Sequence, residues 1–184
     1  MTTQPIEAVL FDLAGTLTAA QPAPTELSLL PQALPALQRL KQNGISAGLL
    51  LDRSDRQLAP LEALISATAS TDQQLRPLPA PDLPAMLALR LRAQALNHCV
   101  LVSGNAEGIR AGLNAGLWTI GTALSGALDR HGNERWSTLS CEEQDRIRLQ
   151  ATMTLMNAGA HYVIDDVAEL DSCLHDIELR QAKA

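Results

Sequence analysis

The sequence is poor in aromatic residues. Phe, Trp and Tyr make up only 2% of the 184 residues, whereas 46% are hydrophobic, most of them Ala and Leu. This composition favours helices packed on a sheet over a β-sandwich, whose strands are richer in aromatic side chains. A chain of this length is expected to form a single domain, residues 1–184, with a substantial core.

Basic clusters, cysteine motifs and long apolar runs are also missing. The net charge is −6, and no basic stretch is dense enough to follow a phosphate backbone, which argues against nucleic acid as a partner. Cys99, Cys141 and Cys173 form no CxxC pair, so neither a zinc site nor a disulfide framework is indicated. No apolar run approaches the roughly 20 residues of a membrane helix, and no signal peptide is visible. We therefore expect a cytoplasmic protein without a membrane segment.

Short apolar runs alternate with helical patterns along the chain. Runs typical of buried strands lie at residues 6–11, 45–51, 99–102, 117–120 and 161–164. Helices are expected between them, and the first of these carries the stripe Leu34, Leu37 and Leu40 with Gly44 at its end. This alternation predicts an α/β Rossmann-like fold, in which a parallel sheet of about five or six strands is covered by helices on both faces.

Several polar residues are placed to begin helices. Ser54 with Gln57 and Ser140 with Glu143 match the capping-box pattern, although Pro60 disfavours the first turns after Ser54. Side chains that can cap a helix singly are Asp82, for a helix running to about Leu96, Asn105 and Asp166.

The most informative stretch follows the first predicted strand and reads Phe-Asp-Leu-Ala-Gly-Thr-Leu, residues 11–17. A carboxylate at the end of a buried parallel strand, here Asp12, lies at the crevice where such sheets bind ligands. Gly15 permits a sharp turn, and Thr16 can hydrogen-bond into it. A carboxylate in this position can attack phosphorus or carbon and form a covalent intermediate.

This stretch resembles the first motif of the haloacid-dehalogenase-like (HAD) superfamily, Asp-x-Asp-Gly-Thr. It is most similar to the Asp-x-Ala-Gly-Thr form of the phosphonoacetaldehyde hydrolase (phosphonatase) branch. The similarity continues in Arg76-Pro77 and in residues 97–102, 114–121, 157–162 and 169–170. It implies a Rossmannoid core with Asp12 as nucleophile and Thr16 and Arg76 at the catalytic site, although Arg76 could equally be a loop residue. It also implies Mg²⁺ on the Asp12 carboxylate and the Ala14 backbone carbonyl.

The sequence departs from the family at its acids. Ala14 stands where the phosphatases carry the acid that protonates the leaving group. Gly104 stands at the metal-ligand Asp of the family, and Gly108 stands at its second Asp. Each lost charge–charge contact at around 4 Å is worth on the order of a few kcal/mol. Mg²⁺ needs nearly octahedral oxygen ligation, so we expect it to bind weakly at best.

Other polar residues are candidates for this crevice. Glu107 is either a replacement metal ligand or a favourable charge in a first helical turn, because it points about 100° away from position 108 on a helix. Asp52, Ser103 and Asn105 are candidates for substrate or phosphate binding. Asp52 would repel phosphate unless a metal intervened, and its alternative is a solvated acid before a helix.

The resemblance also shows what the chain lacks as a phosphonatase. That enzyme cleaves a C–P bond after a lysine of its cap domain forms an imine with the aldehyde. The two lysines here, Lys41 and Lys183, do not lie in a cap, and residues 19–33 provide only a short connection where a cap would be inserted. Hydrolysis of phosphonoacetaldehyde by that mechanism is therefore not expected.

Three functions remain open from the sequence. The first is a catalytically impaired family member that binds a small phosphorylated molecule or a protein partner. The second is a capless Mg²⁺-dependent phosphatase that uses Asp12 as nucleophile. The third is metal-free hydrolysis at carbon, because residues 102–105 also resemble a stretch of the 2-haloacid dehalogenases. The oligomeric state, including a homo-oligomer, is left open.

Overall fold

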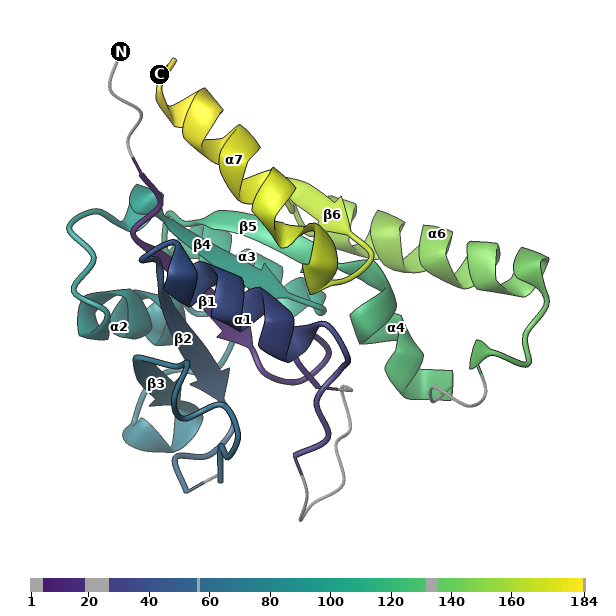
Figure 1. Ribbon diagram of the computed structural model, residues 1–184, viewed down its shortest axis with the longest axis horizontal. Helices are drawn as coiled ribbons and strands as arrows, with labels where there is room; N and C mark the ends of the chain where they lie inside the picture. Colours follow the sequence, from purple (N-terminus) through teal and green to yellow (C-terminus); the bar gives the residue numbers. More distant parts are fainter. Residues whose placement is uncertain (1–4, 19–26, 56, 132–135, 184) are drawn as a thin grey trace.

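Six parallel strands form the centre of the molecule in a computed structural model that describes residues 5–18, 27–55, 57–131 and 136–183. The sheet order is β3-β2-β1-β4-β5-β6, and every neighbouring pair is parallel (Figure 1). The strands are β1 (Ala8–Asp12), β2 (Ser46–Leu51), β3 (Ala67–Ser70), β4 (Cys99–Ser103), β5 (Trp118–Thr122) and β6 (Tyr162–Ile164). The predicted α/β fold with a parallel sheet is confirmed.

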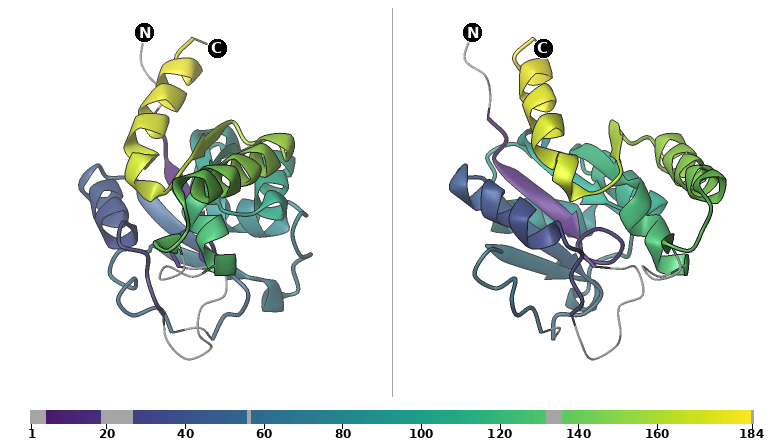
Figure 2. Two further views of the ribbon diagram at one scale, coloured as in Figure 1. Left: turned by 90° about the vertical axis from the view of Figure 1, so that its right-hand side faces the viewer. Right: turned by 45° about the vertical axis from the view of Figure 1, so that its right-hand side comes forward.

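Helices cover both faces of this sheet (Figures 1 and 2). One face carries α1 (Ala33–Gln42) and α7 (Leu170–Gln181), and the other carries α2 (Asp82–Arg90), α3 (Ala106–Asn114) and α6 (Cys141–Asn157). A further helix, α4 (Ala123–His131), follows β5 and packs against α6. Short 3₁₀ turns are η1 (Thr71–Gln73), η2 (Leu96–His98) and η3 (Val167–Glu169).

The side chains of β1 alternate between the two cores. Val9 and Phe11 belong to the core beneath α1 and α7, whereas Ala8 and Leu10 belong to the core beneath α2. Successive strand residues point to opposite faces, so a continuous apolar run is what a strand buried on both sides requires. All four side chains are fully buried. The central position of β1 fixes the place where Asp12 leaves the sheet.

Three predicted helix starts are present as hydrogen bonds. The Asn105 side chain accepts from the Gly108 N–H at 2.7 Å, and Ser140 and Glu143 form a reciprocal capping box. The Asp166 carboxylate accepts from the Ala168 N–H at 2.7 Å at the start of η3, which leads into α7. These caps satisfy N–H groups that have no partner within their own helix.

The prediction of a helix after Ser54 is wrong. Among the described residues from 53 to 65 the chain forms turns, and the Ser54 N–H and hydroxyl both donate to Asp72, at 3.0 and 2.7 Å. Pro60 lies in these turns, where its missing N–H does no harm. The strand that follows, β3, was not expected because its sequence, Ala-Thr-Ala-Ser, has no strong apolar signal.

Asp82 also differs from its expected role. It is the first residue of α2, and Pro81 rather than Asp82 occupies the N-cap. The Asp82 carboxylate instead accepts from the N–H and guanidinium of Arg76. The helix ends at Arg90 instead of near Leu96, and Arg92 adopts a φ of 61°, which ends regular helix.

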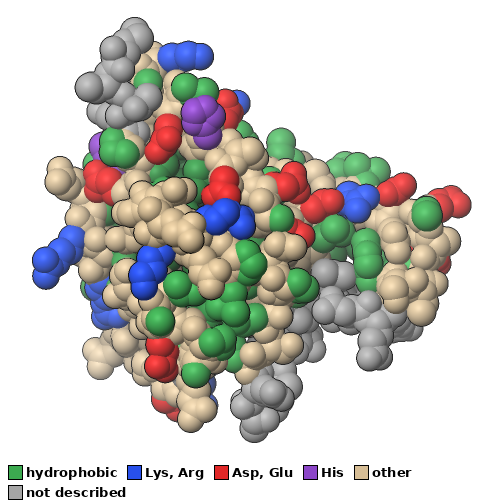
Figure 3. Space-filling model, in the orientation of Figure 1, with side chains coloured by type: hydrophobic (Ala, Val, Ile, Leu, Met, Phe, Trp, Pro, Cys, Tyr) green, Lys and Arg blue, Asp and Glu red, His purple; other side chains and the backbone are tan. Residues whose placement is uncertain are grey.

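Acidic and basic side chains are interspersed over the face that carries α1 and α7 (Figure 3). Within the described part of the chain, no helix combines the length and apolar character needed to cross a bilayer.

Candidate active site

The candidate site lies at the carboxyl ends of the two central strands. Asp12 is the last residue of β1, and Ser103 is the last residue of the neighbouring β4. Because Phe11 pairs with Val102, the next residues along, Asp12 and Ser103, come side by side. Asp52 follows β2 directly, on the other side of β1. The topology therefore gathers these residues at the carboxyl ends of the strands, where parallel sheets of this type bind ligands.

Two neutral donors hold the Asp12 carboxylate. The Ser103 hydroxyl and the Asn105 side-chain N–H both donate to Oδ2, at 3.1 and 2.5 Å. The Asn105 amide is fixed in this orientation because its oxygen accepts the Gly108 N–H. Ser103 is fully buried and accepts the backbone N–H of Asn105 at 3.3 Å, which leaves its proton free for Asp12. Ser103 and Asn105, expected as substrate contacts, thus act on Asp12 itself.

The balance of these surroundings raises the pKa of Asp12. Burial of the carboxyl group is the largest cause, and the nearby charge of Asp52 acts in the same direction. The hydrogen bonds from Ser103 and Asn105 lower the pKa but compensate only in part, so it rises from 3.8 to about 6. Among the described residues, no Lys, Arg or His side chain contributes to this pKa shift of Asp12.

The loop after Asp12 is a tight turn stabilised by its own backbone. Gly15 has a φ of 74°, a conformation that glycine adopts without steric cost. The Leu13 carbonyl accepts from the N–H groups of Leu17 and Thr18 and from the Thr18 hydroxyl. The buried Thr16 hydroxyl accepts the Gly104 N–H at 3.0 Å, so it ties this loop to the one after β4 rather than closing its own turn.

Three glycine backbones meet beside this turn. A Cβ placed on Gly104 would lie 2.1 Å from the Gly15 carbonyl oxygen and 3.1 Å from the Gly126 Cα. A Cβ placed on Gly126 would lie 2.4 Å from the Gly104 oxygen. Real Cβ atoms do not approach backbone this closely, so position 104 accepts only glycine without a backbone shift. We call this contact of Gly15, Gly104 and Gly126 the glycine crossing.

Position 108 is closed by a side chain rather than by backbone. A Cβ on Gly108 would lie 2.2 Å from the Ser103 hydroxyl oxygen, the group that donates to Asp12. An acid at position 104 would require a backbone shift, and an acid at position 108 would require Ser103 to move away from Asp12. Within the described residues, no three His, Cys, Asp or Glu side chains are grouped to hold a metal ion. The residues present do not fit Mg²⁺, which needs several oxygen ligands in octahedral geometry.

The remaining candidates lie apart from the carboxylate of Asp12. The Arg76 side chain is 72% exposed and its guanidinium pairs with Asp82 at 2.7 Å, which is the loop arrangement and not a contact with Asp12. Glu107 is exposed in the first turn of α3, where its negative charge interacts favourably with the helix dipole.

The last two candidates flank the ends of the central strands. Asp52 is exposed, and its backbone carbonyl accepts the Thr71 hydroxyl. Ala14 lies in the turn, where it bridges to Thr18.

One supporting contact was missed at the sequence level. The buried Thr122 hydroxyl, at the end of β5, donates to the Gly15 carbonyl at 3.2 Å. The same oxygen faces Gly104 across the glycine crossing. A threonine that ends a central strand was the available signal, since the ends of parallel strands meet at one edge.

Comparison with known proteins identifies the family. No protein-family model matches the chain. The phosphonoacetaldehyde hydrolase of Bordetella avium is 31% identical over 165 residues, which cover 85% of this chain and 58% of that protein. A phosphonoacetaldehyde hydrolase-like protein from Oleispira antarctica superimposes with a TM-score of 0.77 at 34% identity, over 85% of this chain and 59% of its own. This chain belongs to the HAD superfamily and is phosphonatase-like.

Two further solved structures share the fold of this chain. One solved structure aligns with 96% of this HAD-like chain and 97% of its own chain, at 35% identity and a TM-score of 0.81. A HAD family hydrolase from Deinococcus radiodurans, solved with bound phosphate and sodium, shares the fold at 19% identity and a TM-score of 0.64. The chain spans 58% of the length of the Bordetella relative. Only eight residues, 19–26, separate Thr18 from Leu27, which is too short for a cap domain at that place.

The raised pKa of Asp12 predicts a pH-dependent stability. A carboxyl group whose pKa is higher in the folded than in the unfolded state stabilises the fold below the unfolded value. That stabilisation is lost as the pH rises through the folded value, here about 6. Asp12→Asn removes this loss, so its free energy of unfolding relative to wild type should increase by about 2–3 kcal/mol between pH 4 and pH 7.5. Urea unfolding across this range measures the difference, and a flat difference would contradict the shift.

The glycine crossing predicts that Gly104→Ala destabilises the protein by roughly 1–3 kcal/mol or more, because the new methyl group meets rigid backbone. Gly48→Ala is the matched control, since the nearest atoms to its Cβ would be side-chain atoms of Leu87 and Leu91, at 2.9–3.0 Å, and not backbone. It should lose clearly less stability. Denaturant unfolding of the two variants makes the comparison. A Gly104→Ala protein as stable as wild type would show that the crossing is not tight.

Proposed function

We propose that this protein is a phosphonatase-like HAD core that has lost metal-dependent hydrolysis and acts by binding a ligand or partner at Asp12. One observation carries the proposal. The second acid of the metal site is replaced by Gly104, whose backbone packs against Gly15 and Gly126 with no space for a side chain. The carboxylate that would bind the metal is held instead by Ser103 and Asn105.

The charges around Asp12 determine which ligand suits the crevice. Asp52 lies close enough to Asp12 for its charge to raise the pKa of Asp12. The Arg76 guanidinium, which would offset this charge, is paired with Asp82. A phosphate group brought to two carboxylates without a cation is repelled. The proposed ligand therefore carries hydrogen-bond donors or positive charge, from a small molecule or from the surface of a protein partner that covers the crevice.

A second candidate is favoured by the hydrogen bonds on Asp12. Metal-free hydrolysis at carbon needs a carboxylate that is oriented without a metal, and Ser103 and Asn105 provide this orientation. With a pKa of about 6, Asp12 is largely ionised above pH 7 and retains its nucleophilic oxygen. In this reaction Oδ1 attacks the carbon, a halide leaves with the bonding electrons, and water hydrolyses the resulting ester.

The proposal predicts no metal-dependent turnover. With p-nitrophenyl phosphate and millimolar Mg²⁺ at pH 7.5, release of nitrophenol by the wild-type protein should equal that of Asp12→Asn. The physical reason is that one carboxylate supplies too few ligands to hold the ion and substrate together. Robust Mg²⁺-dependent turnover that Asp12→Asn abolishes would contradict the proposal and establish a capless phosphatase.

The same pair of proteins separates the second candidate. Halide release from 2-chloropropionate is measured at pH 8 with a chelator present, so that no metal contributes. Release above the level of Asp12→Asn would favour metal-free hydrolysis over a binding role. Equal release from both proteins leaves binding as the supported function.

A further inference from the structure

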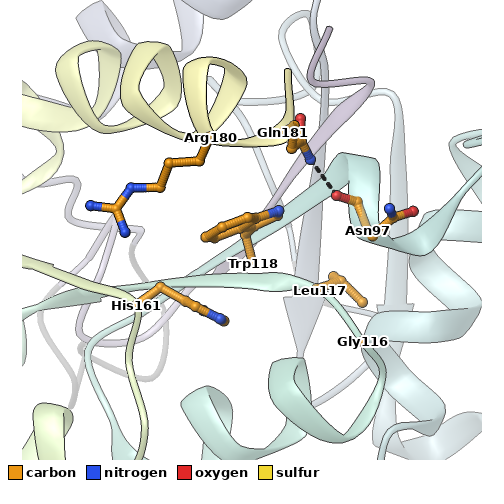
Figure 4. Close-up of a pocket in the computed structure, with 7 residues that line it drawn as sticks. All are labelled: Asn97, Gly116, Leu117, Trp118, His161, Arg180 and Gln181. Carbon is orange, nitrogen blue, oxygen red and sulfur yellow. Dashed lines mark hydrogen bonds between the residues drawn. The ribbon is translucent and has the colours of Figure 1, made fainter. Parts of the chain in front are cut away.

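A second hollow lies at the amino ends of the strands, opposite the end of the sheet that carries Asp12. Its volume is about 500 Å³, within the range of roughly 300–1,000 Å³ that is usual for small-molecule sites. Its lining residues precede or begin the strands β4, β5 and β6 or come from the last turn of α7 (Figure 4). They are Asn97, Gly116, Leu117, Trp118, His161, Arg180 and Gln181. The Asp12 crevice is at the carboxyl ends of the strands, so the two sites are separate.

The base of this hollow is aromatic. The rings of Trp118 and His161 lie with centroids 4.7 Å apart and planes tilted by 50°. Leu117 also borders the hollow, but its side chain is buried in the core beneath α2, so Trp118 supplies the main apolar surface. An indole at the base of a hollow offers a flat apolar face on which the ring of a ligand can stack.

His161 offers a defined donor. Its Nδ1 accepts the backbone N–H of Thr119 at 3.0 Å, so in the neutral ring the proton is on Nε2. Burial, and then the charge of Arg180, lowers the pKa of His161, which keeps the ring neutral near pH 7. The Nε2–H is therefore available as a hydrogen-bond donor to a ligand.

The opposite wall carries a cation. The Arg180 Nε binds Asp176 at 3.0 Å, and the guanidinium lies 5.1 Å from the centre of the Tyr162 ring. Asp176 also accepts the Tyr162 hydroxyl at 2.5 Å, and Lys183 lowers its pKa together with these partners. Arg180 is thus the charged side chain that borders the hollow, and its Asp176 partner is also influenced by Lys183. Among the described residues, Arg180 pairs with Asp176 through its Nε. The two terminal amino groups of the guanidinium can therefore donate to an anion.

The end of α7 is held in place beside these groups. The Gln181 side-chain N–H donates to the Asn97 carbonyl at 2.5 Å, which joins the last turn of α7 to the turn before β4. This bond closes the side of the hollow opposite His161 (Figure 4). The wall that presents Arg180 is therefore part of the fold and not a free chain end.

We propose that this hollow is a binding site for a small aromatic carboxylate. The ring of the ligand lies against Trp118, and its carboxylate meets the Arg180 guanidinium and the His161 Nε2–H. A planar, bidentate anion matches the geometry of a guanidinium, and charge-assisted bonds of this kind are the strongest that such a site offers. The site is independent of the function proposed for Asp12.

The test uses indole-3-carboxylate and its neutral analogue indole-3-carboxamide as probes, followed by ¹H–¹⁵N NMR of the full chain. Trp118 and Trp136 give the two indole N–H signals, so one reports on the site and the other serves as reference. The carboxylate should move the Trp118 signal and leave the Trp136 signal in place. It should bind more tightly than the carboxamide.

Arg180→Gln should weaken the carboxylate about tenfold or more while changing the carboxamide affinity little, because one charge-assisted contact is lost. Arg110→Gln, at an exposed arginine on α3, is the matched control and should bind as wild type. Asp12→Asn should also bind as wild type, which separates this site from the Asp12 crevice. Equal affinity for both probes, no loss in Arg180→Gln, or shifts that map elsewhere would overturn the proposal.

Discussion

The contact between the backbones of Gly15, Gly104 and Gly126 constrains everything around Asp12. It brings the loop after β1 against the loop after β4 and against helix α4, at distances that leave no room for a Cβ. The Thr16 and Thr122 hydroxyls fasten the same loops by binding the Gly104 N–H and the Gly15 carbonyl. A carboxylate at position 104 would have to separate these three segments, so its loss is part of the packing and not an isolated substitution.

The chemistry of Asp12 follows from that constraint. Ser103 and Asn105 donate to the oxygen that faces them, and burial with the Asp52 charge raises the pKa. The result is a half-buried, hydrogen-bonded carboxylate close to a second acid, Asp52. Phosphoryl transfer depends on positive charge near the transferred group. The motif around Asp12 therefore records the ancestry of the chain, whereas the surrounding contacts favour a different use of the same site.

Sequence reasoning succeeded where a local pattern determines the outcome. The strand before Asp12, the Asn105 cap and the Ser140 capping box each depend on neighbouring residues, and each is present. It failed where distant residues decide. The Ser54 hydroxyl donates to Asp72, 18 residues further along the chain, and does not begin a helix. The glycine crossing could not be foreseen, because a glycine in a sequence does not indicate which backbone lies against it.

The central proposal is that the Asp12 site does not bind a divalent ion. Mn²⁺, which has similar ligand preferences to Mg²⁺ and broadens nearby NMR signals, tests it most directly. With stoichiometric Mn²⁺, the amide signals of Leu13, Ala14 and Asn105 should broaden no more in the wild-type protein than in Asp12→Asn. Selective broadening of these signals in the wild type, absent in Asp12→Asn, would show a metal at Asp12 and contradict the account.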